Sequence, residues 1–219
     1  MDFQGLLFKI CTMAPPIVLA ITVHEAAHAY AAYRLGDTTA QRAGRLSLNP
    51  LRHVDLFGTV LVPAALLSMN LPGFGWAKPV PIDPGRLRDP KRDVFWVAAA
   101  GPASNALMAI LWTALFKLVF NPADDVPMTA LESMFWIGIG INLALMTFNL
   151  LPLPPLDGGR IAMSLLPVPW ARKLGRVEPF GFLVLLGLLY FGFLDRVLSP
   201  LLEIQVGFLF RIFRMLPSV

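Results

Sequence analysis

The sequence predicts an all-α polytopic membrane protein with about five to six membrane segments. Of its 219 residues, 56% are hydrophobic and only 15% are charged, a composition far from that of an ordinary soluble domain. Long apolar runs recur along the chain and are separated by short polar loops. The single Cys11 excludes an intrachain disulfide and a cysteine-based metal cage.

The charges of the loops predict how the chain crosses the membrane. Basic residues gather in 34–54, 72–93 and 158–178, whereas 121–130 contains two aspartates and no Lys or Arg. Because cytoplasmic loops carry an excess of Lys and Arg, the first three loops are expected in the cytoplasm and the fourth outside. The apolar segments between and beside these loops cover 5–33, 56–71, 94–120, 133–151, 180–194 and 197–213.

The first apolar segment, 5–33, contains the string HEAAH, with His24, Glu25 and His28. On a helix, positions i and i+4 lie about 40° apart, so the two imidazoles can share a metal ion that Glu25 flanks. This is the geometry of zinc hydrolases, in which zinc activates a water molecule and the carboxylate accepts its proton. The alternative is a pair of core histidines bonded to carbonyl groups, which is disfavoured because such groups are costly in a membrane without a metal.

The second segment, 56–71, has two interpretations. It is short, contains Pro63 and has basic loops on both sides. A re-entrant or surface-lying segment agrees with the charge rule, provided that its backbone groups pack against protein. An ordinary short span that breaks the charge rule is the alternative.

A third zinc ligand must come from another part of the chain, because catalytic zinc normally takes three protein ligands. Position 34, where a longer motif would place a histidine, is Arg34. The candidates are His53 and the remaining carboxylates. Asp157 differs from the others because it lies in NLLPLPPLDGGR, where prolines end an apolar helix and two glycines permit close backbone approach.

Topology supports the choice of Asp157. If 56–71 is re-entrant, the helix ends that carry His28 and Asp157 both face the cytoplasm, and the ligands can meet. If 56–71 crosses fully, Asp157 lies on the exterior side and the site cannot form. The active site is therefore expected near the cytoplasmic side of a multi-pass protein of the cell membrane.

The strings HEAAH, GPASN and NLLPLPPLDGGR together resemble the site-2 protease family of intramembrane zinc metalloproteases, in its compact branch without a PDZ or CBS domain. The resemblance covers about residues 13–165 and includes GRLSLNPLRHVDLFGT and GWAKPVP. It implies that His24, His28 and Asp157 bind one catalytic Zn²⁺ and that Glu25 is the general base. It also implies hydrolysis of peptide bonds in or near transmembrane segments of membrane-protein substrates.

Three polar residues have less specific roles. Asn149 is a candidate donor to the substrate or to the transition state, and its alternative role is to cap the broken helix. Asn105, in GPASN, is a second candidate for such support, although packing between helices is the favoured interpretation. His53 could bind a second metal, orient a group of the site, or lie at the membrane interface, and the interface position is favoured.

The segment near 75–83 predicts a small β-like loop element. Its alternation in GWAKPVPI would offer a strand edge to an extended substrate. The alternative is an interfacial loop that Trp76 and Lys78 anchor.

The chain is expected to divide into a catalytic membrane core, 1–165, and a C-terminal helical hairpin, 166–219. The hairpin is predicted to turn near Asp195 to Pro200, and a gating role is one interpretation of it. No separate soluble domain is expected.

The predicted partners are transmembrane protein substrates and the lipid bilayer, with no nucleic acid, and the sequence does not indicate an oligomeric state. A non-catalytic zinc-binding membrane scaffold or transporter-like module is the alternative function, and a membrane peptidase that trims short peptides is a second enzymatic alternative.

Overall fold

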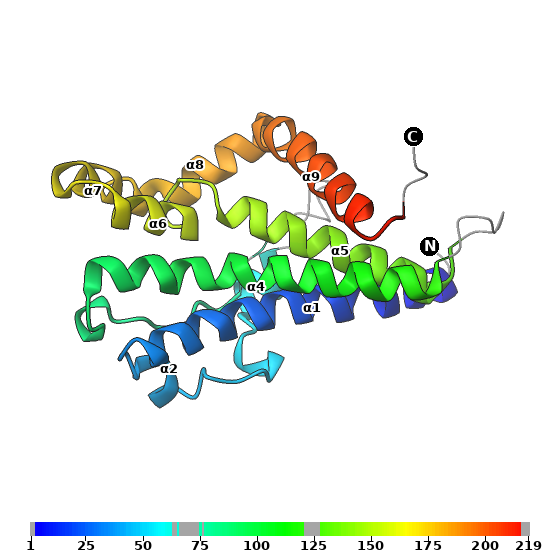
Figure 1. Ribbon diagram of the computed structural model, residues 1–219, viewed down its shortest axis with the longest axis horizontal. Helices are drawn as coiled ribbons and strands as arrows, with labels where there is room; N and C mark the ends of the chain where they lie inside the picture. The colour runs from blue at the N-terminus through cyan, green and yellow to red at the C-terminus, as the bar shows by residue number, and fades with distance from the viewer. Residues whose placement is uncertain (1–2, 63–64, 66–74, 76, 121–127, 216–219) are drawn as a thin grey trace.

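The computed structural model describes residues 3–62, 65, 75, 77–120 and 128–215, and helices dominate them (Figure 1). The long helices are α1 (Phe3–Arg34), α4 (Pro90–Val119), α5 (Ala130–Asn149) and α9 (Phe193–Ile212). The shorter ones are α2 (Thr39–Arg42), α6 (Asp157–Leu165), α7 (Val168–Gly175), α8 (Glu178–Tyr190), the 3₁₀ turns η1 (Pro50–Arg52) and η3 (Pro84–Arg86), and the π-helical turn η2 (Leu56–Leu61). No strand occurs among the described residues.

Helices α1, α4 and α5 pack against one another and form the centre of the molecule (Figure 1). Helix α9 packs on α5, and α6 packs on α4 near the end where α1 finishes. The main apolar core lies between α4, α5 and α9. Its buried side chains are Ala109, Trp112, Phe116, Phe135, Ile139, Leu143 and Leu209.

Side-chain caps explain where α4 and α5 begin. The Asp89 carboxylate accepts a hydrogen bond from the Arg92 N–H, and the Asp93 carboxylate accepts one from the Asp89 N–H. Thr129 and Glu132 form the equivalent reciprocal pair at the start of α5. Each pair satisfies backbone donors that the first turn of a helix leaves unbonded.

Two of the described helices, α4 and α5, are long and apolar enough to cross a membrane, and α8 contains a shorter apolar stretch. The predicted apolar segments 94–120 and 133–151 correspond to these two helices, and 5–33 corresponds to α1. The total of five to six membrane segments stays a prediction.

The C-terminal hairpin differs from the prediction in the position of its turn. Helix α8 ends at Tyr190 and α9 begins at Phe193, so Asp195 to Pro200 lie inside α9. The turn occurs at Phe191 and Gly192, where glycine adopts a φ of 65° that other residues rarely adopt. Pro200 is accommodated within α9, although proline disfavours helix interiors.

The β-like element predicted near 75–83 is wrong for the residues described there, which form an irregular chain. The backbone N–H of Lys78 bonds to the His53 carbonyl group instead of to a neighbouring strand. Pro79 and Pro81 have no N–H to contribute to a ladder. Within 56–71, Leu56–Leu61 form the π-helical turn η2, and most of the rest lies outside the described residues, so the choice between a re-entrant segment and a span stays open.

The chain between α1 and α4 folds back along the last turns of α1. Two small apolar clusters hold it there: Ala29, Ala40 and Val80 form one, and Ala32, Leu87 and Val97 form the other. This packing brings residues 77–88 alongside the helix that carries the HEAAH string.

Candidate metal centre

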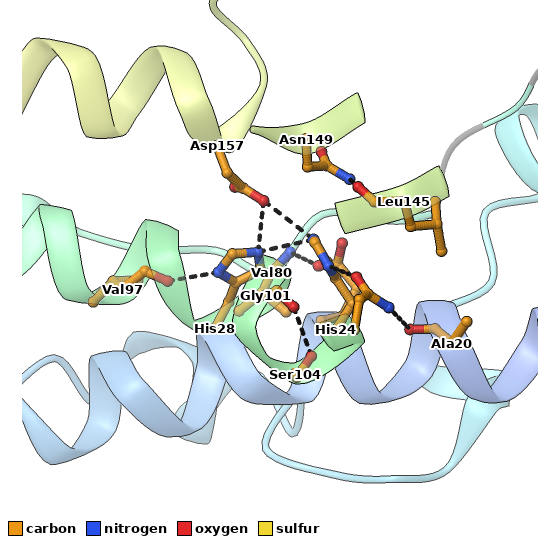
Figure 2. Close-up of polar contacts among 12 residues, drawn as sticks. Ala20, His24, His28, Val80, Val97, Gly101, Ser104, Leu145, Asn149 and Asp157 are labelled. Carbon is orange, nitrogen blue, oxygen red and sulfur yellow. Dashed lines mark hydrogen bonds and ion pairs between the residues drawn. The ribbon is translucent and has the colours of Figure 1, made fainter. Parts of the chain in front are cut away.

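Three side chains from two distant parts of the chain converge on one point (Figure 2). His24 and His28 lie one turn apart on α1, and Asp157 is the first residue of α6. The Asp157 Oδ2 atom lies 3.2 Å from His24 Nε2 and 3.3 Å from His28 Nε2, and the two Nε2 atoms are 3.1 Å apart. All three residues are at least nine-tenths buried.

These separations suit a zinc ion. With bonds of about 2.0–2.2 Å, the ligand atoms of tetrahedral zinc lie about 3.3–3.6 Å apart, close to the distances observed. Asp157 Oδ2 is buried and takes part in no hydrogen bond among the described residues, so a cation is the partner that this oxygen lacks. His24, His28 and Asp157 are therefore a fitting zinc ligand set.

The remaining nitrogen of each histidine has a partner that fixes its tautomer. His28 Nδ1 lies 2.7 Å from the Val97 carbonyl oxygen, which can only accept, so Nδ1 carries the proton. His24 Nδ1 lies 2.6 Å from Asn105 Oδ1 and donates to it. In the neutral tautomer each Nε2 atom presents its lone pair toward the other Nε2 atom and toward Asp157. A cation at this point satisfies all three groups at once.

A chain of buried amides extends behind His24. The Asn105 Nδ2 group donates to Asn142 Oδ1 at 2.9 Å and to the Ala20 carbonyl oxygen at 3.3 Å, and Asn142 in turn donates to the Gly138 carbonyl oxygen. Both asparagines are fully buried. Partners of this kind orient a metal-binding imidazole and fix its tautomer.

Glu25 borders the same cavity as the three ligand residues. Its Oε2 atom accepts a hydrogen bond from the Val80 N–H at 3.0 Å. The cavity has a volume of about 450 Å³. Its other lining is mostly apolar and comes from α1, residues 75 and 77–82, α5, the turn before α6, α6 and α8. It includes Ile21, Pro79, Val80, Leu145, Phe148, Leu156, Phe182 and Leu185.

The turn between α5 and α6 places Asp157. Helix α5 ends at Asn149 before three prolines, and α6 begins directly at Asp157. A Cβ atom on Gly158 would lie 2.3 Å from the Leu150 carbonyl oxygen, and one on Gly159 would lie 2.3 Å from the Pro154 nitrogen. Only glycine at both positions allows the first turn of α6 to pack this closely on the turn that precedes it.

The other predicted residues lie in different surroundings. Asn149 lines the cavity, but its Nδ2 group donates to the Leu145 carbonyl oxygen of its own helix at 3.0 Å. Asn105 lies behind His24. His53 is 2% exposed and bonded to Ser47 and Lys78, and its position at the membrane interface stays a prediction.

Sequence reasoning missed four contributors to the site. Asn142 is a polar residue inside an apolar run, as Asn105 is, and this shared feature could have identified it. Arg160 lines the cavity one turn after Asp157, whereas its charge in the sequence indicates only that 158–178 is a cytoplasmic loop. The Val97 carbonyl group and the Val80 N–H belong to the backbone, and no residue type could reveal them.

Comparisons with known proteins show which family the chain resembles. The family model described as peptidase family M50 matches residues 119–189. The chain is 42% identical to YwhC of Bacillus subtilis over 192 residues, which are 85% of this chain and 84% of that protein. It is 29% identical to Rip2 of Mycolicibacterium smegmatis, over 82% of this chain and 66% of the relative, and 28% identical to Rip2 of Mycobacterium tuberculosis, over 77% and 62%. All three relatives carry the name "Putative zinc metalloprotease", and no solved structure matches the chain.

Proposed function

The chain belongs to peptidase family M50, the site-2 protease family of membrane zinc metalloproteases, and from this premise we propose that it cleaves peptide bonds in or near the transmembrane segments of membrane-protein substrates. Family membership indicates Zn²⁺ as the cofactor. The observation that carries the proposal is the convergence of His24, His28 and Asp157 beside Glu25 on one cavity.

His24, His28 and Asp157 would hold the zinc ion through their Nε2 and Oδ2 atoms. Bound zinc supplies Lewis acidity, which activates water and polarises a carbonyl group. The Asn105 amide and the Val97 carbonyl group keep both imidazoles turned toward the ion.

Glu25 is assigned the role of general base. Its position on the cavity wall allows it to accept a proton from the attacking water and to deliver that proton to the leaving amine. Among the described residues, Glu25 Oε2 accepts a hydrogen bond from the Val80 N–H. Oε1 is then the oxygen left to take the proton.

The walls of the cavity support a membrane-protein substrate. Leu145, Phe148 and Leu185 offer apolar contacts of the kind that transmembrane side chains require. A peptide bond inside a helix is hydrogen-bonded internally and sees little water, so the substrate must unwind locally before it reaches Glu25. Asn149, on the same wall, is the proposed donor to the unwound segment, and capping of α5 is its alternative role.

The two proposed parts of the chain contribute differently to the same cavity. Residues 1–165 supply the zinc ligands and the base, and 166–219 supply Phe182 and Leu185 to the wall. This position supports a gating role for the α8–α9 hairpin.

Removal of the Glu25 carboxylate tests the function. In purified protein reconstituted in liposomes with a transmembrane test substrate, Glu25→Gln should keep its zinc and lose cleavage by about 10²–10⁴-fold, the usual contribution of a general base. Glu203→Gln, which alters an exposed carboxylate on α9, should retain both zinc and cleavage. Normal cleavage by Glu25→Gln would show that another group is the base.

A zinc-binding scaffold is the second candidate. Structural zinc usually has four protein ligands that close the site, whereas the ligand group found among the described residues has three members and opens on a cavity. Zinc binding without cleavage of any substrate would favour the scaffold. Cleavage of short peptides alone would favour a peptide-trimming enzyme.

A further inference from the structure

A short segment, residues 77–82, lies between the cavity and the chain that follows α1; we call it the strap. Ala77, Pro79, Val80 and Ile82 line the cavity. The strap also donates a hydrogen bond to the proposed base, from the Val80 N–H to Glu25 Oε2. Whatever fixes the strap therefore fixes the orientation of the Glu25 carboxylate.

Two buried residues fix the strap at Lys78, His53 through its backbone and Arg45 through its side chain. The His53 carbonyl oxygen accepts a hydrogen bond from the Lys78 N–H at 2.9 Å. The Arg45 Nη2 group donates to the Lys78 carbonyl oxygen. Both backbone groups of Lys78 are thus bonded to one pair of residues, only two positions before Val80.

The pair is itself held together. His53 Nε2 lies 2.7 Å from the Ser47 carbonyl oxygen, an acceptor, so Nε2 carries the proton. His53 Nδ1 then accepts from Arg45 Nη2 at 3.4 Å. With both ring nitrogens engaged in this way, His53 is not free to bind a second metal.

The burial of Arg45 calls for a specific role. Arg45 is 6% exposed, and a buried cation is costly unless it is well bonded or paired. Burial lowers the pKa of Arg45 below its usual value, and the negative charge of Glu25 opposes that shift. The carboxylate of Glu25 thus belongs to the electrostatic surroundings of the guanidinium group.

We propose that Arg45 and His53 are positioning residues, which clamp the strap at Lys78 so that the Val80 N–H holds Glu25 in the orientation for proton transfer. This role rests on the proposed function of Glu25. It assigns His53 to the support of the site and not to metal binding.

Amide hydrogen exchange tests the clamp without reference to activity. A peptide that covers 77–83 reports few amides, because Pro79 and Pro81 contribute none. In Arg45→Gln, these amides should exchange at least about tenfold faster than in the wild type, since Lys78 loses a bond. Arg42→Gln, which alters an exposed arginine three residues away, should leave exchange at the wild-type rate.

Kinetics test the consequence for the base. Arg45→Gln should keep its zinc and its KM within about threefold, and should lower kcat by about tenfold to a hundredfold through the misplaced carboxylate. Arg45→Lys, which can still donate to the Lys78 carbonyl group, should recover part of kcat. If Arg45→Gln does not fold, His53→Leu takes its place, because leucine removes the acceptor for Arg45 Nη2.

Two results would overturn the clamp. Unchanged exchange over 77–83 in the folded variant would show that Arg45 does not hold the strap. Loss of zinc together with loss of kcat would show that the pair supports the metal centre as a whole. If the wild-type protein cleaves no substrate, the proposed function fails, but the exchange experiment still decides whether the strap is clamped.

Discussion

At the scale of single residues, Gly101 determines how closely α4 approaches the metal ligands. A Cβ atom at this position would lie 2.3 Å from His28 Nε2 and 2.6 Å from His24 Cε1. Separations this short cannot exist, so a larger residue would displace the imidazoles or α4. The glycine of the GPASN string thus keeps space for the ligand nitrogens and for the ion between them.

Gly101→Ala should therefore weaken zinc binding by at least about tenfold, in the range reported for disturbed metal-ligand support. Alanine favours a helix over glycine by about 1 kcal/mol, so the helical content should not fall. Zinc content after dialysis and circular dichroism measure the two effects. Gly140→Ala on α5, where a Cβ atom would meet nothing within 4 Å, should keep its zinc. Full zinc occupancy in Gly101→Ala would contradict the steric argument.

At the scale of elements, Asp37 joins the end of α1 to the segment that precedes α4. It is fully buried and accepts hydrogen bonds from the Thr39 N–H at 2.9 Å, from the Thr39 hydroxyl group and from the Asp83 N–H at 2.7 Å. Burial alone would raise the pKa of Asp37, but these bonds and the charge of Arg86 hold it below its usual value. The ionised carboxylate therefore stabilises the fold.

Stability linked to Asp37 should depend on pH. Because the pKa is lower in the folded state, the contribution is complete above the unfolded value of about 3.9 and disappears as the pH falls through the folded value. Asp37→Asn should lower the Tm in detergent at pH 7, and the difference from the wild type should narrow below about pH 4. Glu203→Gln is the control and should show no such difference. A gap that stays constant to pH 3 would show that charge is not the cause.

The same scale separates what sequence could predict from what it could not. Hydropathy located α1, α4, α5, α8 and α9, because long apolar runs determine these helices directly. Helices α6 and α7 are short and partly polar, so no long apolar run predicts them. The spacing of the HEAAH string predicts His24 and His28 as ligands, and topology and the family resemblance predict Asp157. The bonds of Arg45 and His53 to Lys78 depend instead on tertiary packing between segments 25 to 33 residues apart, which no local pattern predicts.

At the scale of the whole molecule, the proposed site lies at the end of the bundle where α1 finishes and α6 begins (Figure 1). Arg34, the last residue of α1, lies at this end, and the chain that follows carries Arg42, Arg45 and Arg52. By the charge rule this end is expected to face the cytoplasm, and the chain before α5 is expected to lie outside.

Cysteine labelling tests this orientation, and a Cys11→Ser background leaves no other thiol. In intact cells, a membrane-impermeant maleimide should label Met128→Cys, which lies just before α5. It should label Arg42→Cys only after the membrane is opened. Both positions are exposed on the protein, so accessibility depends on the side of the membrane. The reverse pattern would place the site on the exterior side.

The hydrogen bonds of the strap have a final consequence for the peptides it can meet. From Lys78 to Pro81, two N–H groups are already used, by His53 and Glu25, and the two prolines have none. The backbone of this stretch has no free N–H group, so any peptide backbone that pairs with it must bring free N–H groups. The interior of an intact helix has none, because each N–H is bonded to the carbonyl group four residues earlier in the chain; only the first turn of a helix or an unwound stretch has them. We therefore expect the strap to pair only with a peptide segment that has already left the helix.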